Sequence, residues 1–285
     1  MEILTIVLAS LLSLGSGGGV ILDKVVQDKI GSQVVSVEQQ AVRIDNRPNY
    51  DVARGKLSRV RIASRGVTIE PGFKIAVVDL ETDPVAVKLS KLSFDSIESL
   101  RESLATPATG AAKIVFTQSD LNQALESKEI RRQLQSTLNR LIASKAGSSN
   151  ISYELSNVRL NLRPNNRLNI SFQLARQRPN LNFKSQKVER GTSQVQNRSK
   201  ELTISLELTL KVLEGKTIRI LNPQGTVNGR PMSSRLLNGF ASGISDRLDL
   251  DTLEEDGILA RILQLKISED TMQLVGFVRL ETKTP

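Results

Sequence analysis

The sequence predicts an α+β protein in which a long curved antiparallel sheet wraps around amphipathic helices. Long segments alternate between apolar and polar residues, which is typical of strands with one buried face. Amphipathic helical segments are fewer. Aromatic residues make up only 3% of the 285 residues, so Leu, Ile and Val must fill the interior. A chain of this length can bury a substantial core.

The clearest alternation runs from Leu202 to Val212, where every even-numbered residue is apolar and the odd-numbered residues are Thr, Ser, Glu and Lys. A strand of this length spans roughly 36 Å at the usual rise per residue. Such a strand is well above the common length and favours a large curved sheet.

Two further runs, 158–163 and 168–174, alternate in the same way and are joined by Pro164-Asn165-Asn166. Pro and Asn are typical of tight turns, so we predict a β-hairpin here. Upstream, the apolar residues up to Leu155 occupy odd positions, so the alternation changes phase at Ser156-Asn157. This change predicts a β-bulge, which bends a long strand.

The remaining strands are less regular. Segments 55–64, 74–82 and 85–89 are predicted to be strands separated by Gly and Pro residues. The segment 272–280 also alternates, and we expect it to close the sheet.

Helices are predicted at three places. Thr117 and Asp120 have the spacing of a capping box, and the apolar stripe that follows changes phase at Ser127. This pattern predicts two consecutive helices or one broken helix. A further helix is expected to begin at Pro231, and a short one at 259–263.

The composition restricts enzyme chemistry. The chain has no His, Cys or Trp. Ser–His–Asp and Cys–His catalysis are therefore excluded, as are zinc and iron–sulfur sites. A carboxylate-based hydrolase acting on lipid or glycan would require two acids in one cleft. The acidic cluster from Asp249 to Asp256 lacks the spacing of a calcium loop, and we interpret it as a capping turn. We expect no enzyme activity, no cofactor and no metal ion.

The net charge of +9 favours an anionic partner. Segment 163–200 contains nine basic residues and the single acid Glu189, which is an excess of eight. The part from Gln177 to Lys200 is rich in Asn, Gln and Ser and predicts a long loop. This basic loop could contact anionic headgroups or be only a solvated loop. No nucleic-acid-binding motif accompanies the charge, so we expect no nucleic-acid partner.

The amino-terminal segment 1–22 is set apart by its hydrophobicity. No charged residue lies between Glu2 and Asp23, and Ile3 to Leu14 is almost continuously apolar. Roughly 20 uncharged residues could cross a bilayer or form a signal peptide. However, no basic residue precedes the run and three glycines follow it. A signal, an anchor and a packed terminus all stay open, and residues 23–285 are predicted to form a single elongated domain.

The strands with one apolar face allow two interpretations. The face can simply pack against helices as a core. Because the strands are long and the helices few, part of the face can instead form a hydrophobic groove, and such grooves hold acyl chains. The candidate groove residues are Leu160, Leu162, Leu168, Ile170, Phe172, Leu206, Leu208 and Leu210.

Two motifs stand out in the chain. The first is Gly55-Lys56-Leu57, followed by a strand to Ser64 and by Gly66-Val67. The second is the segment from Lys113 to Asn122, a strand followed by a helix that starts at a Thr and continues with Asp-Leu-Asn. Together these motifs resemble the LmeA-like phospholipid-binding family, and the resemblance covers about residues 20–285.

This resemblance implies a tubular lipid-binding fold with a hydrophobic tunnel. It also implies phospholipid binding on the outer side of a cytoplasmic membrane, which is a periplasmic or extracytoplasmic location. The amino terminus departs from this pattern because its targeting signal is weak, so the cytoplasmic side also stays open.

Together these observations predict a non-catalytic protein that binds, or transfers, a phospholipid or similar amphiphile at an anionic membrane surface. Headgroup contacts are expected from five basic residues: Arg176, Arg178, Lys184, Lys187 and Arg190. The alternative is a structural or scaffolding module of the cell envelope, in which the apolar face is a closed core.

Overall fold

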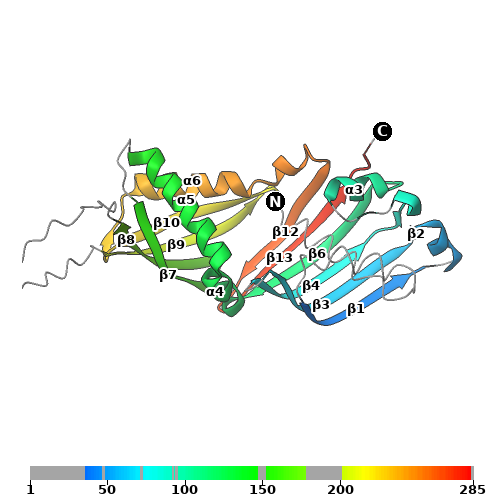
Figure 1. Ribbon diagram of the computed structural model, residues 1–285, viewed down its shortest axis with the longest axis horizontal. Coiled ribbons are helices and arrows are strands. Elements are labelled where there is room, and N and C mark those ends of the chain that lie inside the picture. Colours follow the sequence, from blue (N-terminus) through cyan, green and yellow to red (C-terminus); the bar gives the residue numbers. More distant parts are fainter. Residues whose placement is uncertain are drawn as a thin grey trace, which may run out of the picture.

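The computed structural model describes residues 36–46, 49–70, 73–91, 93, 96–146, 152–177 and 201–283. The predicted amino-terminal segment 1–22 and most of the basic loop therefore lie outside the described residues. The described strands are antiparallel and form two large sheets and a small third one; the two large sheets lie side by side along an elongated molecule (Figure 1). The α+β class is as predicted, but the strands are divided between two open sheets rather than one sheet wrapped around helices.

The first sheet has six strands. In spatial order they are β1 (Ser36–Asp45), β3 (Arg59–Glu70), β4 (Phe73–Thr82), β6 (Ala108–Thr117), β13 (Thr271–Leu280) and β12 (Ile258–Ile267). Strand β13 lies between β6 and β12, so the prediction that it closes the sheet is wrong. The predicted short helix at 259–263 is also wrong, because this segment belongs to β12. Alternate residues Ile258, Ala260 and Ile262 are buried there, which is the period of a strand.

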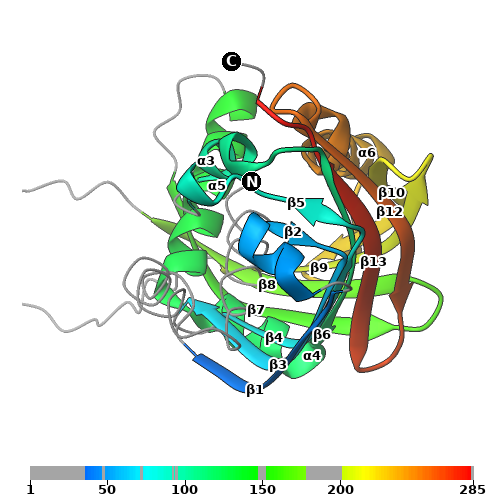
Figure 2. The same cartoon turned by 90° about the vertical axis from the view of Figure 1, so that its right-hand side faces the viewer.

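The burial pattern of this sheet changes phase partway along β3 and β4. In β3 the buried residues before Gly66 are Val60, Ile62 and Ser64, and beyond Gly66 they are Val67 and Ile69. Gly66 has a φ of +60°, a conformation that favours glycine. Figure 2 shows the six strands as a curved layer, with β2, β5 and α3 on its concave side.

The second sheet has five strands. In spatial order they are β11 (Arg230–Pro231), β10 (Thr217–Val227), β9 (Glu201–Leu213), β8 (Arg167–Gln177) and β7 (Ser152–Arg163). The predicted long strand is confirmed as β9, which has 13 residues. The predicted hairpin is β7–β8, and Asn165 and Asn166 in its turn both have positive φ. The predicted bulge is confirmed by a register shift between Ser156 and Arg159, with Asn157 at a φ of 53°.

A small two-stranded sheet lies at one end of the molecule. Its strands are β2 (Lys56–Leu57) and β5 (Val85–Ala86), flanked by the 3-10 helices η2 (Asn49–Arg54) and η3 (Leu89–Lys91). The predicted strand 55–64 is therefore divided between β2 and β3, and the predicted strand 85–89 is only two residues long.

The described helices are α3 (Ile97–Ser103), α4 (Gln118–Glu126), α5 (Lys128–Ala146) and α6 (Ser234–Ser245), with the short η4 (Asp246–Leu248) and η5 (Leu250–Leu253). Thr117 caps α4 as predicted, because its side chain accepts a hydrogen bond from the Asp120 N–H. The break at Ser127 is also confirmed, whereas α6 begins at Ser234 rather than at Pro231. Within the described residues, no helix has the length and hydrophobicity needed to span a membrane.

Candidate functional site

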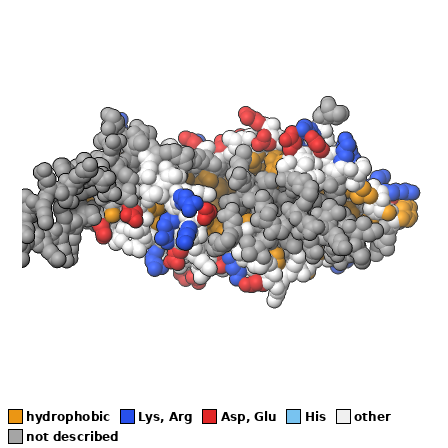
Figure 3. Space-filling view, in the orientation of Figure 1, with side chains coloured by type: hydrophobic (Ala, Val, Ile, Leu, Met, Phe, Trp, Pro, Cys, Tyr) orange, Lys and Arg blue, Asp and Glu red, His pale blue; other side chains and the backbone are white. Residues whose placement is uncertain are grey.

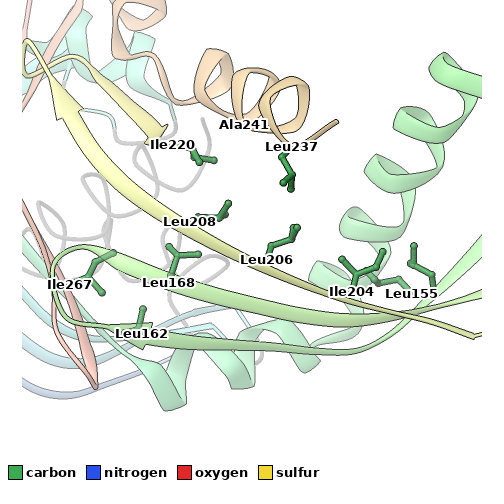
Figure 4. Close-up of a cluster of buried hydrophobic side chains, with 11 residues drawn as sticks. Leu155, Leu162, Leu168, Ile204, Leu206, Leu208, Ile220, Leu237, Ala241 and Ile267 are labelled. Atoms are coloured by element: carbon green, nitrogen blue, oxygen red, sulfur yellow. The ribbon is translucent and has the colours of Figure 1, made fainter. Parts of the chain in front are cut away.

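The apolar face of the five-stranded sheet brings the predicted groove residues together. Leu160 of β7, Ile170 of β8 and Leu206 of β9 lie opposite one another across the strands. The next row is formed by Leu162 and Leu168 with Leu208. All eight candidates belong to one hydrophobic cluster. We call these eight residues the apolar floor. Figure 4 shows Leu206 and Leu208 pointing from β9 toward Leu237 of α6.

Burial divides the eight candidates into two groups. Four have side chains that are at most 6% exposed: Leu162, Leu168, Leu206 and Leu208. The other four are only partly buried: Leu160, Ile170, Phe172 and Leu210. The first group belongs to the core, whereas the second presents apolar surface to solvent.

The apolar floor is less completely covered than the other hydrophobic clusters. Among the described residues, eleven members of its cluster are buried and fifteen packed against them are only partly buried. Of the two other clusters, one has eight buried and six partly buried residues and the other has six of each. The partly buried residues therefore do not outnumber the buried ones in either. In Figure 3, hydrophobic side chains are visible in a hollow beside α5. An open apolar surface of this kind is typical of an interaction or ligand site.

Helix α6 covers one margin of the apolar floor. Leu237 and Ala241 are its buried apolar residues, and they pack in the same cluster as Leu206. Gly225 of β10 makes this close approach possible, because a Cβ at this position would lie 2.7 Å from Leu206 and 2.9 Å from Leu237. At the far end of α6, the Ser245 hydroxyl accepts a hydrogen bond from the Ile220 N–H at 3.1 Å.

Helices α4 and α5 cover the opposite margin by binding the free edge of β7. The Asn122 side chain accepts a hydrogen bond from the Leu160 N–H and donates one to the Leu160 carbonyl, both at 2.8 Å. Gln118 accepts from the Leu162 N–H at 2.6 Å, and Gln135 accepts from the Leu155 N–H at 2.7 Å. These side-chain amides satisfy backbone groups that a further strand would otherwise pair.

We call these three side-chain amides, Gln118, Asn122 and Gln135, the amide ladder. The ladder was not predicted, although the sequence holds a signal for it. Gln118 and Asn122 are four residues apart, so both lie on one face of α4. Nothing in the local pattern of β7 shows which helix lies beside its edge.

The apolar floor continues toward the six-stranded sheet. Leu265 and Ile267 of β12 and Met272 of β13 belong to its cluster. Asn166 in the β7–β8 turn accepts a hydrogen bond from the Ile267 N–H at 2.8 Å, which joins the two sheets. The hairpin turn predicted from the sequence therefore also connects the sheets.

The predicted headgroup residues are only partly described. Arg176 is exposed near the end of β8, opposite Tyr153 of β7. Four others lie outside the described residues: Arg178, Lys184, Lys187 and Arg190. Contact of these four side chains with a lipid headgroup stays a prediction.

Charged groups with shifted pKa values lie in exposed ion pairs. Hydrogen bonds to Glu98 and Glu102 raise the pKa of Lys283. The hydrogen bond from Lys283 lowers the pKa of Glu98. The acidic cluster acts as the predicted capping turn, because Asp249 accepts a hydrogen bond from the Asp251 N–H at 3.0 Å. The described residues contain no group of metal-ligating side chains.

A family model described as LmeA-like phospholipid-binding matches residues 15–277. The chain belongs to this family. No curated protein and no solved structure matches it. The family match confirms the resemblance inferred from the two motifs.

The motif residues have structural roles in the described chain. Gly55 has a φ of +74°, and a Cβ there would lie 2.2 Å from the Val87 carbonyl oxygen. In the second motif, Thr117 caps α4, Leu121 packs against the apolar floor and Asn122 binds the edge of β7. The motif therefore places α4 at the margin of the candidate site.

Proposed function

We propose that the protein binds a phospholipid, or a similar amphiphile, with acyl chain packed against the partly buried half of the apolar floor. The observation that carries this proposal is the incomplete cover of that floor in a member of a phospholipid-binding family. The partly buried side chains are Leu160, Ile170, Phe172 and Leu210.

Acyl-chain burial supplies the binding energy in this proposal. Each methylene removed from water contributes about 0.8 kcal/mol. About ten methylenes would thus contribute roughly 8 kcal/mol, from which the cost of ordering the lipid is subtracted. Polar interactions would orient the headgroup rather than provide most of the affinity.

We place the headgroup near the end of β8 that carries Arg176. The basic loop begins directly after this strand, and its positive charge would attract an anionic headgroup. Binding takes place at a membrane, and transfer between membranes is an extension of the same function.

The proposed role is non-catalytic. The chain has neither His nor Cys, so the Ser–His and Cys–His pairs that activate the nucleophile in many hydrolases are missing. A scaffolding module would need a closed core, and the partly buried half of the floor speaks against that alternative.

Lipid extraction and native mass spectrometry of the purified full chain test the proposal. We expect a co-purifying phospholipid and uptake of lipid with brominated acyl chains. Because the chain has no Trp, the Ile170→Trp variant carries a single indole on the apolar floor. Bromine should quench its fluorescence.

Ser171→Trp is the matched control, because successive residues of a strand point to opposite faces. Its indole should keep its fluorescence when lipid binds. A protein that purifies without lipid and takes none up, or equal quenching in both variants, would refute the proposal.

A further inference from the structure

A second apolar surface lies at the end of the molecule that carries the two-stranded sheet. We call residues 49–57 and 85–91 the tip. Tyr50, Val52 and Leu89 of the tip are 62%, 40% and 49% exposed. They are three of the six large hydrophobic side chains that are exposed among the described residues. Figure 3 shows hydrophobic side chains beside basic ones at this end.

Backbone hydrogen bonds fix the conformation of the tip, so its apolar side chains are exposed by the fold. The Gly55 N–H donates to the Val52 carbonyl at 2.9 Å, and the Gly55 carbonyl accepts from the Val87 N–H at 2.8 Å. Val87 also pairs with Leu104, which is 2% exposed. The bond between Gly55 and Val87 joins the two segments of the tip, and the Val87–Leu104 bridge joins the tip to the core.

The tip is also basic. Arg54, Lys56, Lys88 and Lys91 are all exposed, whereas Asp51 is its one acid, which leaves an excess of three positive charges. None of the four basic side chains forms an ion pair with another described residue. By contrast, basic side chains on the six-stranded sheet, such as Arg65, pair with acids of neighbouring strands. The Arg54 guanidinium lies 5.3 Å from the centre of the Tyr50 ring.

We propose that the tip docks the protein on an anionic lipid bilayer. Tyr is favoured at the boundary between headgroups and acyl chains, and the exposed Val52 and Leu89 would enter the same layer. The basic side chains form no ion pair with a described residue, so they would contact anionic headgroups, each raising the affinity about fivefold. This inference rests on the proposed function and names the surface through which the protein reaches its lipid source.

A fluorescent reporter at the tip tests this proposal in the full chain. The Tyr50→Trp variant carries the only indole of the chain. With phosphatidylcholine vesicles containing phosphatidylglycerol and brominated acyl chains, its emission should shift to the blue and be quenched. Leu263→Trp is the matched control, because Leu263 lies on β12 and is 63% exposed, as Tyr50 is 62% exposed. Its emission should not change.

Charge variants test the basic component. Lys88→Gln with Lys91→Gln should weaken vesicle binding about 25-fold, at about fivefold for each basic residue. High salt or vesicles of phosphatidylcholine alone should weaken binding of the unaltered tip. The control pair Lys211→Gln and Lys266→Gln removes two exposed lysines elsewhere and should leave binding unchanged.

The outcomes separate this proposal from the proposed function. Vesicle binding without a response of the Tyr50→Trp indole would overturn tip docking. A response that depends on protein concentration and not on vesicles would also overturn it, because it would show self-association. Tip insertion without lipid uptake by the Ile170→Trp variant would support docking and refute the proposed function. Lipid uptake without insertion of the tip would support the proposed function and overturn tip docking.

Discussion

Asn122 should hold the edge of the five-stranded sheet, and Asn122→Ala is expected to destabilise the protein by about 2 kcal/mol. The substitution removes both hydrogen bonds to Leu160. Each such bond contributes about 1 kcal/mol net, and an unpaired buried backbone group costs roughly a further 1–3 kcal/mol. The bonds are part-buried, so water can replace some of the lost interactions and the lower end of the range applies.

Urea unfolding measures this loss. Asn122→Asp keeps an acceptor for the Leu160 N–H but places a second acceptor against the Leu160 carbonyl, so we expect at least the same destabilisation. Gln123→Ala, at an exposed position of α4, is the control and should change stability by less than about 0.5 kcal/mol. If Asn122→Ala costs no more than Gln123→Ala, the amide ladder does not hold β7, and our reasoning is refuted. Because Leu160 lies in the proposed site, Asn122→Ala should also reduce lipid uptake.

Three other substitutions give distinct results. The Ser64 hydroxyl is buried without a hydrogen-bond partner among the described residues, so Ser64→Ala should stabilise the protein by about 1 kcal/mol in urea unfolding; a loss would contradict this. Gly225→Val should destabilise by roughly 1–3 kcal/mol, because its side chain would collide with Leu237; unchanged stability would show that α6 can move freely. The Glu98–Lys283 pair, with a lowered and a raised pKa, should stabilise at neutral pH and lose its effect as pH falls below 4.5 or rises above 10.5. Thermal melts of Glu98→Gln across pH should therefore show a shallower acid decline, and an identical profile would argue against the pair.

The features predicted correctly from the sequence depend on residues close together in the chain. The bulge at Ser156-Asn157 follows from a change of phase within one strand. The turn at Asn165 and Asn166 follows from residues that tolerate positive φ, and the cap at Thr117 from its spacing to Asp120. Backbone conformation at these positions is set within a few residues, so local pattern was sufficient.

The errors occurred where a short segment fits two structures. The spacing of Leu259, Ile262 and Leu263 suits a helix face, yet pairing with β13 makes this segment a strand. Strand β10 was not predicted, because Pro223 interrupts its alternation; the structure accommodates it at a register shift after Leu221. In both cases the neighbouring strands decide the conformation.

By itself the sequence determined an α+β chain with a long one-sided strand at β9, and it identified the phospholipid-binding family through two short motifs. Only the tertiary structure decided that Leu206 is core while Ile170 is partly exposed, although both occupy equivalent positions in alternating strands. Alternation shows which face of a strand is apolar, but burial depends on which helix lies above each residue. That placement is made by long-range contacts such as Asn122 with Leu160 and Leu237 with Gly225.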